Sequence, residues 1–159
     1  MTLGLKRGTV ELRPSSPDYP ALFDEEHVRV QHALGPLATD IQHVGSTSVP
    51  GLIAKPILDL AVAVRDAGAT ALCVEPLAGI GYTFMGDRVG NGEAFFAKGG
   101  DEARTHYFHL LPISHPHWRA YLVFRDALRE DAELRDEYTA HKAGFIERVL
   151  QRGRVDGER

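Results

Sequence analysis

The stretch PILDLAVAV, residues 56–64, decides the fold of this chain. Every residue in it is non-polar except Asp59. A continuous non-polar run of this length, rich in valine, is typical of a strand that other elements cover on both faces. We therefore predict a central strand over residues 56–64.

Side chains along a strand point alternately to the two faces of its sheet. Asp59 therefore shares a face with Ala61 and Ala63, while Leu60 and Val62 point to the other face. An ionised carboxylate in such surroundings is costly unless a partner compensates it. Two interpretations stay open: Asp59 accepts hydrogen bonds from the backbone or an arginine, or it binds a divalent metal ion or a cationic substrate.

A loop rich in Gly, Ser and Pro, GSTSVPG at residues 45–51, precedes the central strand. Glycine allows the backbone to approach a ligand closely, and successive backbone amides can bind a phosphate. Lys55 adds a positive charge just before the strand. By itself, the loop sequence is typical of a turn. Together with Lys55 and Asp59, it indicates a phosphate site. Its candidate residues are His43, Gly45, Ser46, Thr47, Ser48 and Lys55.

The remaining patterns predict a mixed sheet with helices packed against it. Strands are expected at residues 8–13, 40–44, 82–85, 93–97 and 104–111, and helices at 18–34, 66–81, from 114 and from about 131 to 151. Neither internal repeats nor a linker interrupts this order. We predict a single α+β (or α/β) domain over residues 1–159.

His109 is the best candidate to work with Asp59. Alternation over residues 104–111 places Tyr107 and His109 on one face and His106 on the other. If this strand neighbours the central one, His109 faces Asp59. It would then act as a metal ligand or as a general acid or base, and a purely structural histidine is the alternative. Imidazole would favour a transition metal over Mg²⁺.

Two arginines are candidate phosphate ligands. Arg125 lies within the non-polar stripe of the helix that starts near residue 114, so it needs a partner. That partner is either a carboxylate such as Asp126 or Asp59, or a phosphate of the ligand. Arg104 follows a Gly-rich turn and can bind a phosphate in the same way, with a solvated surface arginine as the alternative.

These residues resemble the sequence pattern of a known superfamily and, more closely, that of one family within it. Val44-Gly45-Ser46 followed by Asp59 in a non-polar strand is similar to the nucleotidyltransferase superfamily, in which Gly-Ser holds the triphosphate and strand carboxylates hold Mg²⁺. The closer resemblance is to the GrpB family, and it covers the chain from about residue 10 to 150. The segments that carry it are HVGSTSVPGL (43–52), AKPI (54–57), Asp59, RTH (104–106), His109 and FRD (124–126).

The resemblance implies a nucleotidyltransferase-like fold and a nucleotide site. The expected ligands are a nucleoside triphosphate and a divalent metal, Mg²⁺ or Mn²⁺, or a transition metal if His109 ligates it. The expected reaction is transfer of a nucleotidyl group to an unknown acceptor. However, Ala61 occupies the position of the superfamily's second carboxylate. Two alternatives therefore remain: a non-catalytic nucleotide-binding or folding-accessory module, and a phosphohydrolase with an Asp/His metal centre.

Composition excludes several other classes. The 159 residues carry 18 Lys+Arg and 22 Asp+Glu, a formal net charge of −4, so a dedicated duplex-DNA binder is not expected. No stretch approaches the ~18 consecutive non-polar residues of a membrane helix, and the first residues do not resemble a signal peptide. Cys73 is the one cysteine and cannot form an internal disulfide. We expect a cytoplasmic protein that does not bind membranes.

Overall fold

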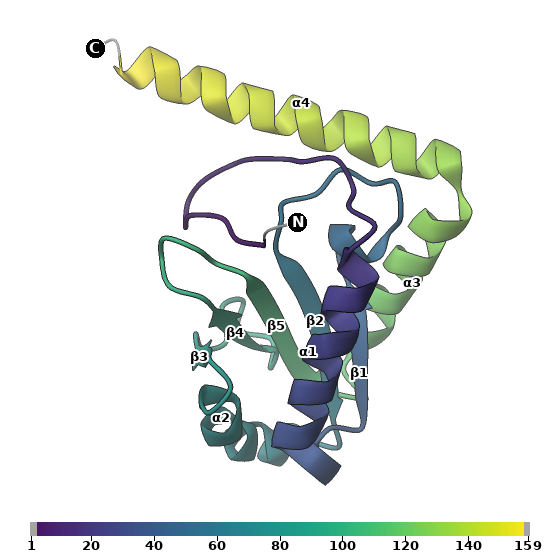
Figure 1. The fold of residues 1–159 in the computed structure, drawn as a ribbon, viewed down its shortest axis with the longest axis vertical. Coiled ribbons are helices and arrows are strands. Elements are labelled where there is room, and N and C mark those ends of the chain that lie inside the picture. Colours follow the sequence, from purple (N-terminus) through teal and green to yellow (C-terminus); the bar gives the residue numbers. More distant parts are fainter. Residues whose placement is uncertain (1–2, 158–159) are drawn as a thin grey trace.

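A computed structural model describes residues 3–157 as an α+β fold (Figure 1). The two residues at each end of the predicted 1–159 domain lie outside this range. The strands are β1 (Asp40–Val44), β2 (Leu58–Val64), β3 (Tyr82–Phe84), β4 (Ala94–Lys98) and β5 (His106–Pro112). The α-helices are α1 (Tyr19–Leu34), α2 (Thr70–Ala78), α3 (Pro116–Glu130) and α4 (Ala132–Gly157). Short 3₁₀ helices are η1 (Gly35–Leu37), η2 (Ser46–Ser48) and η3 (Ala67–Ala69).

The five strands form one mixed sheet in the order β1-β2-β5-β4-β3. The neighbours β2 and β5 run parallel, and every other pair is antiparallel. In this register Asp59 lies opposite Val44 of β1 and Tyr107 of β5. The sheet therefore brings the Gly-Ser turn, the central strand and the histidine strand side by side.

β2 is the buried strand that the sequence predicts. Its residues are fully buried except Asp59, which retains partial exposure. Leu58, Leu60 and Val62 point into the main core under α1 and α2, where they pack with residues such as Phe96 and Phe108. Ala61 and Ala63 point to the opposite face and pack against Trp118 of α3. The predicted alternation of β2 is thus confirmed.

A buried carboxylate on α1 contacts the two strands at one edge of the sheet, β3 and β4. Glu26 is fully buried and accepts hydrogen bonds from the Tyr82 hydroxyl and the Lys98 ammonium, each at 2.7 Å. Burial by itself would raise the pKa of Glu26, but the bonds from Lys98 and Tyr82 outweigh it and lower the pKa. The carboxylate is therefore compensated, and it joins α1 to β3 and β4.

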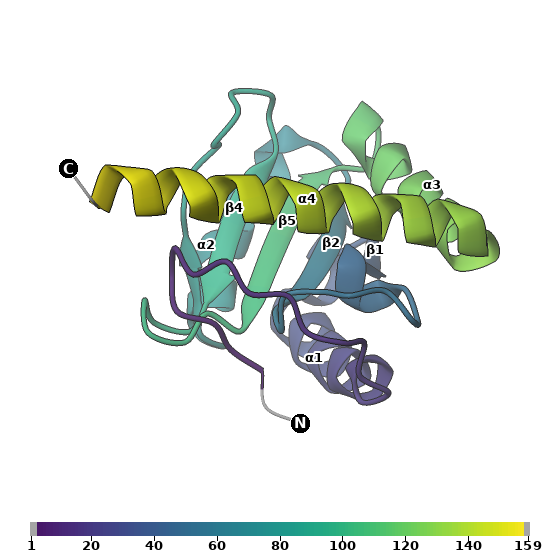
Figure 2. The same cartoon turned by 90° about the horizontal axis from the view of Figure 1, so that it is seen from above.

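The opposite face of the sheet is covered unevenly. α3 packs against β1 and β2, while α4 continues from α3 across one end of the sheet (Figures 1 and 2). The start of β2 and the η2 turn lie at that end, because Lys142 of α4 contacts Ser46. Asp59 therefore lies on the sheet face that carries α3, close to the end that α4 crosses.

The predicted strand at residues 8–13 is wrong. Only Arg13 forms an isolated bridge, with Ala54, and residues 9–12 have no strand geometry. Alternating residues become a strand only when a partner strand offers a ladder of hydrogen bonds, and here the bonds from Arg13 to Ala54 are a single exchange. The other predicted elements are present with bounds shifted by a few residues, the helix at 66–81 being shortened to η3 and α2.

None of the helices that the structure describes has the length and non-polar character needed to cross a membrane.

Shortening Leu60 tests whether β2 carries the core. Leu60→Ala removes a fully buried side chain from the main core and should lower the free energy of unfolding by about 2–5 kcal/mol. Leu72→Ala on α2 is the matched control, because Leu72 is 61% exposed and its loss should change stability by no more than about 0.5 kcal/mol. Denaturant unfolding of both variants measures the difference, and equal losses would contradict this account of the core.

Candidate functional site

A small hollow of about 190 Å³ lies directly beside Asp59. Its walls come from three places: the η2 turn, the start of β2 and β5, and α4. The lining residues are Ser46, Thr47, Lys55, Ile57, Asp59, Tyr107 and Lys142. Four of the residues predicted for the phosphate and metal site therefore share one hollow with two residues that sequence reasoning did not identify, Tyr107 and Lys142.

Gly45 allows the turn to pass against the Asp59 carboxylate. Its φ of 72° lies in the left-handed region, which L residues avoid. A β-carbon at this position would come within 2.8 Å of Asp59 Oδ2. Only glycine therefore satisfies both the backbone conformation and the contact, which explains the Gly-Ser order in the loop.

The three hydroxyls of the η2 turn have different surroundings. Ser46 faces the hollow, and its Oγ accepts a hydrogen bond from Lys142 Nζ at 3.2 Å. Thr47 and Ser48 are buried. Thr47 Oγ1 lies 2.8 Å from His43 Nε2, and Ser48 Oγ donates to the Gly45 carbonyl at 2.5 Å. The side chains of Thr47 and Ser48 thus stabilise the turn, while Ser46 is the hydroxyl available to a ligand.

Asp59 and His109 meet as the alternation predicts. His109 Nε2 lies 3.3 Å from Asp59 Oδ1. On its other side, His109 Nδ1 lies 3.0 Å from a carboxylate oxygen of Glu93. Glu93 also accepts a hydrogen bond from the Tyr121 hydroxyl and lies 3.2 Å from His117 Nδ1. His109 is therefore held between two carboxylates in a chain that reaches from β2 to α3.

This row of contacts between Asp59, His109 and Glu93 favours the charged, imidazolium form of His109. Burial by itself would lower the pKa of His109, but its hydrogen bonds to Asp59 and Glu93 outweigh burial and raise the pKa to about 9. Burial would likewise raise the pKa of Glu93, yet the bonds from His109, Tyr121 and His117 lower it to about 2. At neutral pH both nitrogens of His109 therefore carry protons and donate to the two carboxylates.

This protonation state decides how the residues suit a metal ion. A metal ligand needs a free lone pair on an imidazole nitrogen, and both nitrogens of His109 face carboxylates, so metal binding there would have to displace a proton and one of these contacts. Among the described residues, no group of three or more His, Cys, Asp or Glu side chains is arranged to hold a metal. Asp59 does suit Mg²⁺ or Mn²⁺, because such ions bind one or two carboxylates together with waters and phosphate oxygens.

Arg104 lines a second hollow on the same face of the sheet. Its guanidinium is buried and donates to Asp101 at 3.1 Å. The second hollow measures about 200 Å³ and shares Tyr107 with the first. Arg7, Arg88 and Phe95 also line it, and the Arg88 guanidinium lies 4.3 Å from the centre of the Phe95 ring. Arg104 thus lies next to the Asp59 hollow rather than in it.

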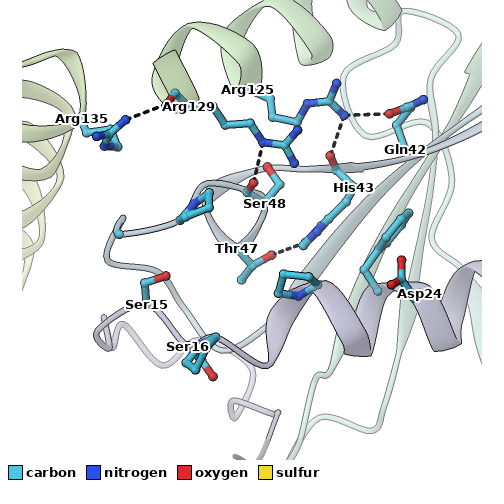
Figure 3. Close-up of a pocket in the computed structure, with 15 residues that line it drawn as sticks. Ser15, Ser16, Asp24, Gln42, His43, Thr47, Ser48, Arg125, Arg129 and Arg135 are labelled. Carbon is cyan, nitrogen blue, oxygen red and sulfur yellow. Dashed lines mark hydrogen bonds between the residues drawn. The ribbon is translucent and has the colours of Figure 1, made fainter. Parts of the chain in front are cut away.

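Arg125 and His43 line a third and larger cavity, on the other side of the η2 turn (Figure 3). Arg125 Nη1 donates to Gln42 Oε1 at 2.8 Å and to the His43 carbonyl at 3.0 Å, and its Nε donates to Asp126 at 2.9 Å. The arginine is therefore paired within the fold, with Asp126 and not with Asp59. The predicted set of phosphate residues is divided between separate hollows.

Sequence reasoning missed several members of the site. Glu93 lies next to a non-polar strand, so the argument used for Asp59 applies to it as well: a carboxylate in such surroundings needs a partner. His117 lies at the start of a helix and Tyr121 within the non-polar stripe of that helix, and neither position indicates a contact with Glu93. Lys142 carries no local signal, since only the path of α4 brings it to Ser46.

The fold and the hollow define the class of protein. It is a mixed α+β domain in which a Gly-Ser turn meets a strand carboxylate, as in nucleotidyltransferase-like folds. A family model described as GrpB protein matches residues 9–156, and the chain belongs to the GrpB family.

Individual relatives agree with this family. The UPF0157 protein YqkA of Bacillus subtilis is 36% identical over 133 residues, which are 84% of this chain but only 38% of YqkA. The glutamate-rich protein GrpB of Alkalihalophilus pseudofirmus is 31% identical over 92% of this chain and 86% of its own length. The crystal structure of the conserved protein GrpB from Enterococcus faecalis matches with a TM-score of 0.79 at 30% identity, covering 86% of this chain and 83% of that chain.

Titration of His109 tests the carboxylate chain. Because the pKa of His109 is raised from 6.5 to about 9, its stabilising effect is complete below about pH 6.5 and is lost as the pH rises through about 9. Glu93→Gln removes one charged partner and should lower this pKa. NMR titration of the His109 ring measures it, with Glu75→Gln, an exposed carboxylate on α2, as the control. An unchanged pKa in Glu93→Gln would contradict the arrangement.

Replacing Gly45 tests its close approach to Asp59. Gly45→Ala adds both the strain of a left-handed alanine, about 1–2 kcal/mol, and a contact at 2.8 Å with the carboxylate. Gly51→Ala is the matched control, since Gly51 also has a positive φ, of 83°, but nothing lies within 4 Å of the added carbon. Denaturant unfolding should show a clearly larger loss for Gly45→Ala. Equal losses of stability in Gly45→Ala and Gly51→Ala would contradict this account, because the contact between the added carbon and Asp59 would then cost nothing.

Proposed function

We propose that this protein binds a nucleoside triphosphate with a divalent metal ion in the Asp59 hollow and transfers the nucleotidyl group to an acceptor. The observation that carries the proposal is the meeting of the Ser46 turn, the Asp59 carboxylate and two lysines in one hollow. A triphosphate has several negative oxygens, so it needs both cations and backbone donors close together. Asp59 would hold the divalent metal that such a ligand brings with it.

Each residue has a role that its surroundings support. Lys55 and Lys142 neutralise phosphate charge, and the Ser46 hydroxyl and turn amides orient the phosphate chain. Asp59 holds the metal, which supplies charge stabilisation at the reacting phosphate when bound. His109 is a positioning residue: its Nε2 proton fixes Asp59 Oδ1, and Glu93 and Tyr121 hold the ring in place.

The two hollows on this face fit the size of such a ligand. The first, at about 190 Å³, takes phosphates but not a whole nucleotide. The second, at about 200 Å³, shares Tyr107 with it and is lined by Arg88, Phe95 and Arg104. Together they reach the range of about 300–1,000 Å³ that is usual for small-molecule sites. We assign the phosphates to the first hollow and the base or the acceptor to the second.

A non-catalytic nucleotide-binding module is the second candidate, because one specific observation favours it. Ala61, two residues after Asp59 on the same face, is fully buried against α3 and supplies no second carboxylate. Two-metal transfer chemistry needs ligands that hold two ions about 3.5–4 Å apart. A module of this kind would bind the nucleotide and release no product.

Calorimetric titration with ATP, CTP, GTP and UTP, with and without Mg²⁺ or Mn²⁺, tests the proposal. We expect metal-dependent binding of at least one nucleotide. Lys142→Gln should weaken it about tenfold or more, because a charge-assisted contact to phosphate is lost. Asp59→Asn should abolish the metal dependence. Arg65→Gln is the matched control, since Arg65 is 88% exposed and follows the opposite end of β2.

Product analysis then separates the two candidates. Release of pyrophosphate that stops in Asp59→Asn would support transfer. Binding without metal dependence and without pyrophosphate would support the module instead. If none of the four nucleotides binds, both candidates are wrong.

A further inference from the structure

A cavity larger than the Asp59 hollow lies outside the proposed nucleotide site. It measures about 860 Å³ and opens between the start of α1, the edge strand β1 and the junction of α3 with α4 (Figure 3). We call it the arginine cavity, because Arg125, Arg129 and Arg135 line it. Its volume lies within the usual range of small-molecule sites, about 300–1,000 Å³.

The arginine cavity is separate from the Asp59 hollow. The η2 turn divides them: Ser46 and Asp59 line the small hollow, Ser48 and Arg129 line the arginine cavity, and Thr47 lines both. A ligand in the arginine cavity therefore has no need of Asp59 or of the two lysines. The inference below does not depend on the proposed function.

Each arginine is fixed by the fold and still has donors to offer. Arg125 and Arg129 donate to the carbonyls of His43 and Ser48, and Arg135 donates to the carbonyls of Leu128 and Arg129. The Nη2 atoms of all three donate to no residue that the structure describes. Side chains already held in place lose little further freedom when a ligand binds, so this arrangement is preorganised.

Three arginines line the cavity, and two carboxylates offset part of their charge: Asp24 in the lining, and Asp126, which lies 2.9 Å from Arg125 and 4.0 Å from Arg129. Asp24 is the one carboxylate among its lining residues, and Figure 3 shows it on the side opposite Arg125 and Arg129. The positive field also acts on His43: burial, then Arg129 and Arg125, lower its pKa to about 4. His43 is therefore neutral at pH 7, and the positive charge of the cavity comes from the arginines alone. A phosphate monoester offers three acceptor oxygens, one more than a carboxylate, and can therefore accept from several of the free Nη2 donors at once.

A non-polar wall completes the cavity. Phe23 of α1 and His43 of β1 stack with their ring centres 4.8 Å apart and their planes within 8° of each other. Pro17, Pro20 and Pro50 also line the cavity. A ligand with a flat or non-polar body can pack on this wall while its anionic group faces the arginines.

From these contacts we propose that the arginine cavity binds an organic phosphate, a phosphate monoester with a non-polar or aromatic body. The phosphate oxygens accept hydrogen bonds from the free Nη2 donors, because the guanidinium fork matches phosphate geometry. The body of the ligand packs against Phe23 and the prolines. The cavity is thus a second ligand site, independent of the metal-dependent site at Asp59.

Phenyl phosphate is a suitable probe, since it combines an aromatic ring with a phosphate that is dianionic above its second pKa of about 6. Titration of the ¹⁵N-labelled protein at pH 7.5 should give saturable NMR shifts of the Nε–Hε signals of Arg125 and Arg129 and of the Ser48 amide. The amides of Lys55 and Asp59 should stay in place. Arg129→Gln and Arg135→Gln should each raise the Kd about tenfold or more. Benzoate, a monoanion, should bind at least tenfold more weakly than phenyl phosphate.

Two controls keep the outcome clear. Arg119→Gln removes an exposed arginine of the same helix, α3, that does not line the cavity, and it should bind phenyl phosphate like the unmodified protein. Lys142→Gln, which should impair nucleotide binding, should also leave phenyl phosphate binding unchanged. Thermal unfolding of Arg129→Gln and Arg135→Gln shows whether each remains folded.

The inference is wrong if phenyl phosphate gives no saturable shifts, or if its shifts fall on Lys55 and Asp59 instead. It is also wrong if both folded arginine variants bind it with the original Kd, or if benzoate binds equally well. Loss of phenyl phosphate binding in Lys142→Gln would show that phenyl phosphate binds in the Asp59 hollow, and the proposal of a second site would then be wrong. Nucleotide binding is tested by loss in Asp59→Asn and Lys142→Gln, and phenyl phosphate binding by loss in Arg129→Gln and Arg135→Gln, so failure of either proposal leaves the other intact.

Discussion

The compensation of Asp59 is the constraint on which the rest of this structure depends. Asp59 is a partly exposed carboxylate within an otherwise buried central strand, and it needs compensation. His109 of the neighbouring parallel strand provides it, with Nε2 lying 3.3 Å from Asp59 Oδ1. A buried imidazolium needs compensation in turn, which Glu93 provides from the start of β4. Tyr121 of α3 donates to the same glutamate. One ionic chain therefore fixes how β2, β4, β5 and α3 meet.

The η2 turn is the second point on which the architecture converges. Gly45 lets the backbone lie against Asp59, and the turn that follows presents Ser46 to one hollow and Ser48 to another. Lys142 contacts the turn from one side, while Arg129 binds its Ser48 carbonyl from the other. Three residues of 3₁₀ helix thus separate a hollow suited to phosphates and a metal from a cavity rich in arginine.

Much of the fold could be predicted because it rests on local patterns. The non-polar run around Asp59 and the alternation of Tyr107 and His109 require no knowledge of neighbours, and both are confirmed. The strand predicted at residues 8–13 failed because a strand depends on a partner that local sequence does not specify. The placement of Arg125 beside Gln42 depends likewise on how α3 packs against β1. Glu93 is the intermediate case, a carboxylate whose position before a strand was visible but whose partner was not.

The sequence by itself determined that a buried strand carries one carboxylate, that a Gly-Ser turn precedes it, and that the chain belongs with the GrpB family. These properties follow from the order of residues along the chain, which sets strand faces and turn conformations. Only the tertiary structure decided that both nitrogens of His109 face carboxylates, that Lys142 reaches Ser46, and that Arg125 and Asp59 line different hollows. The physical reason is that charge compensation and cavity shape depend on distances between elements far apart in the sequence.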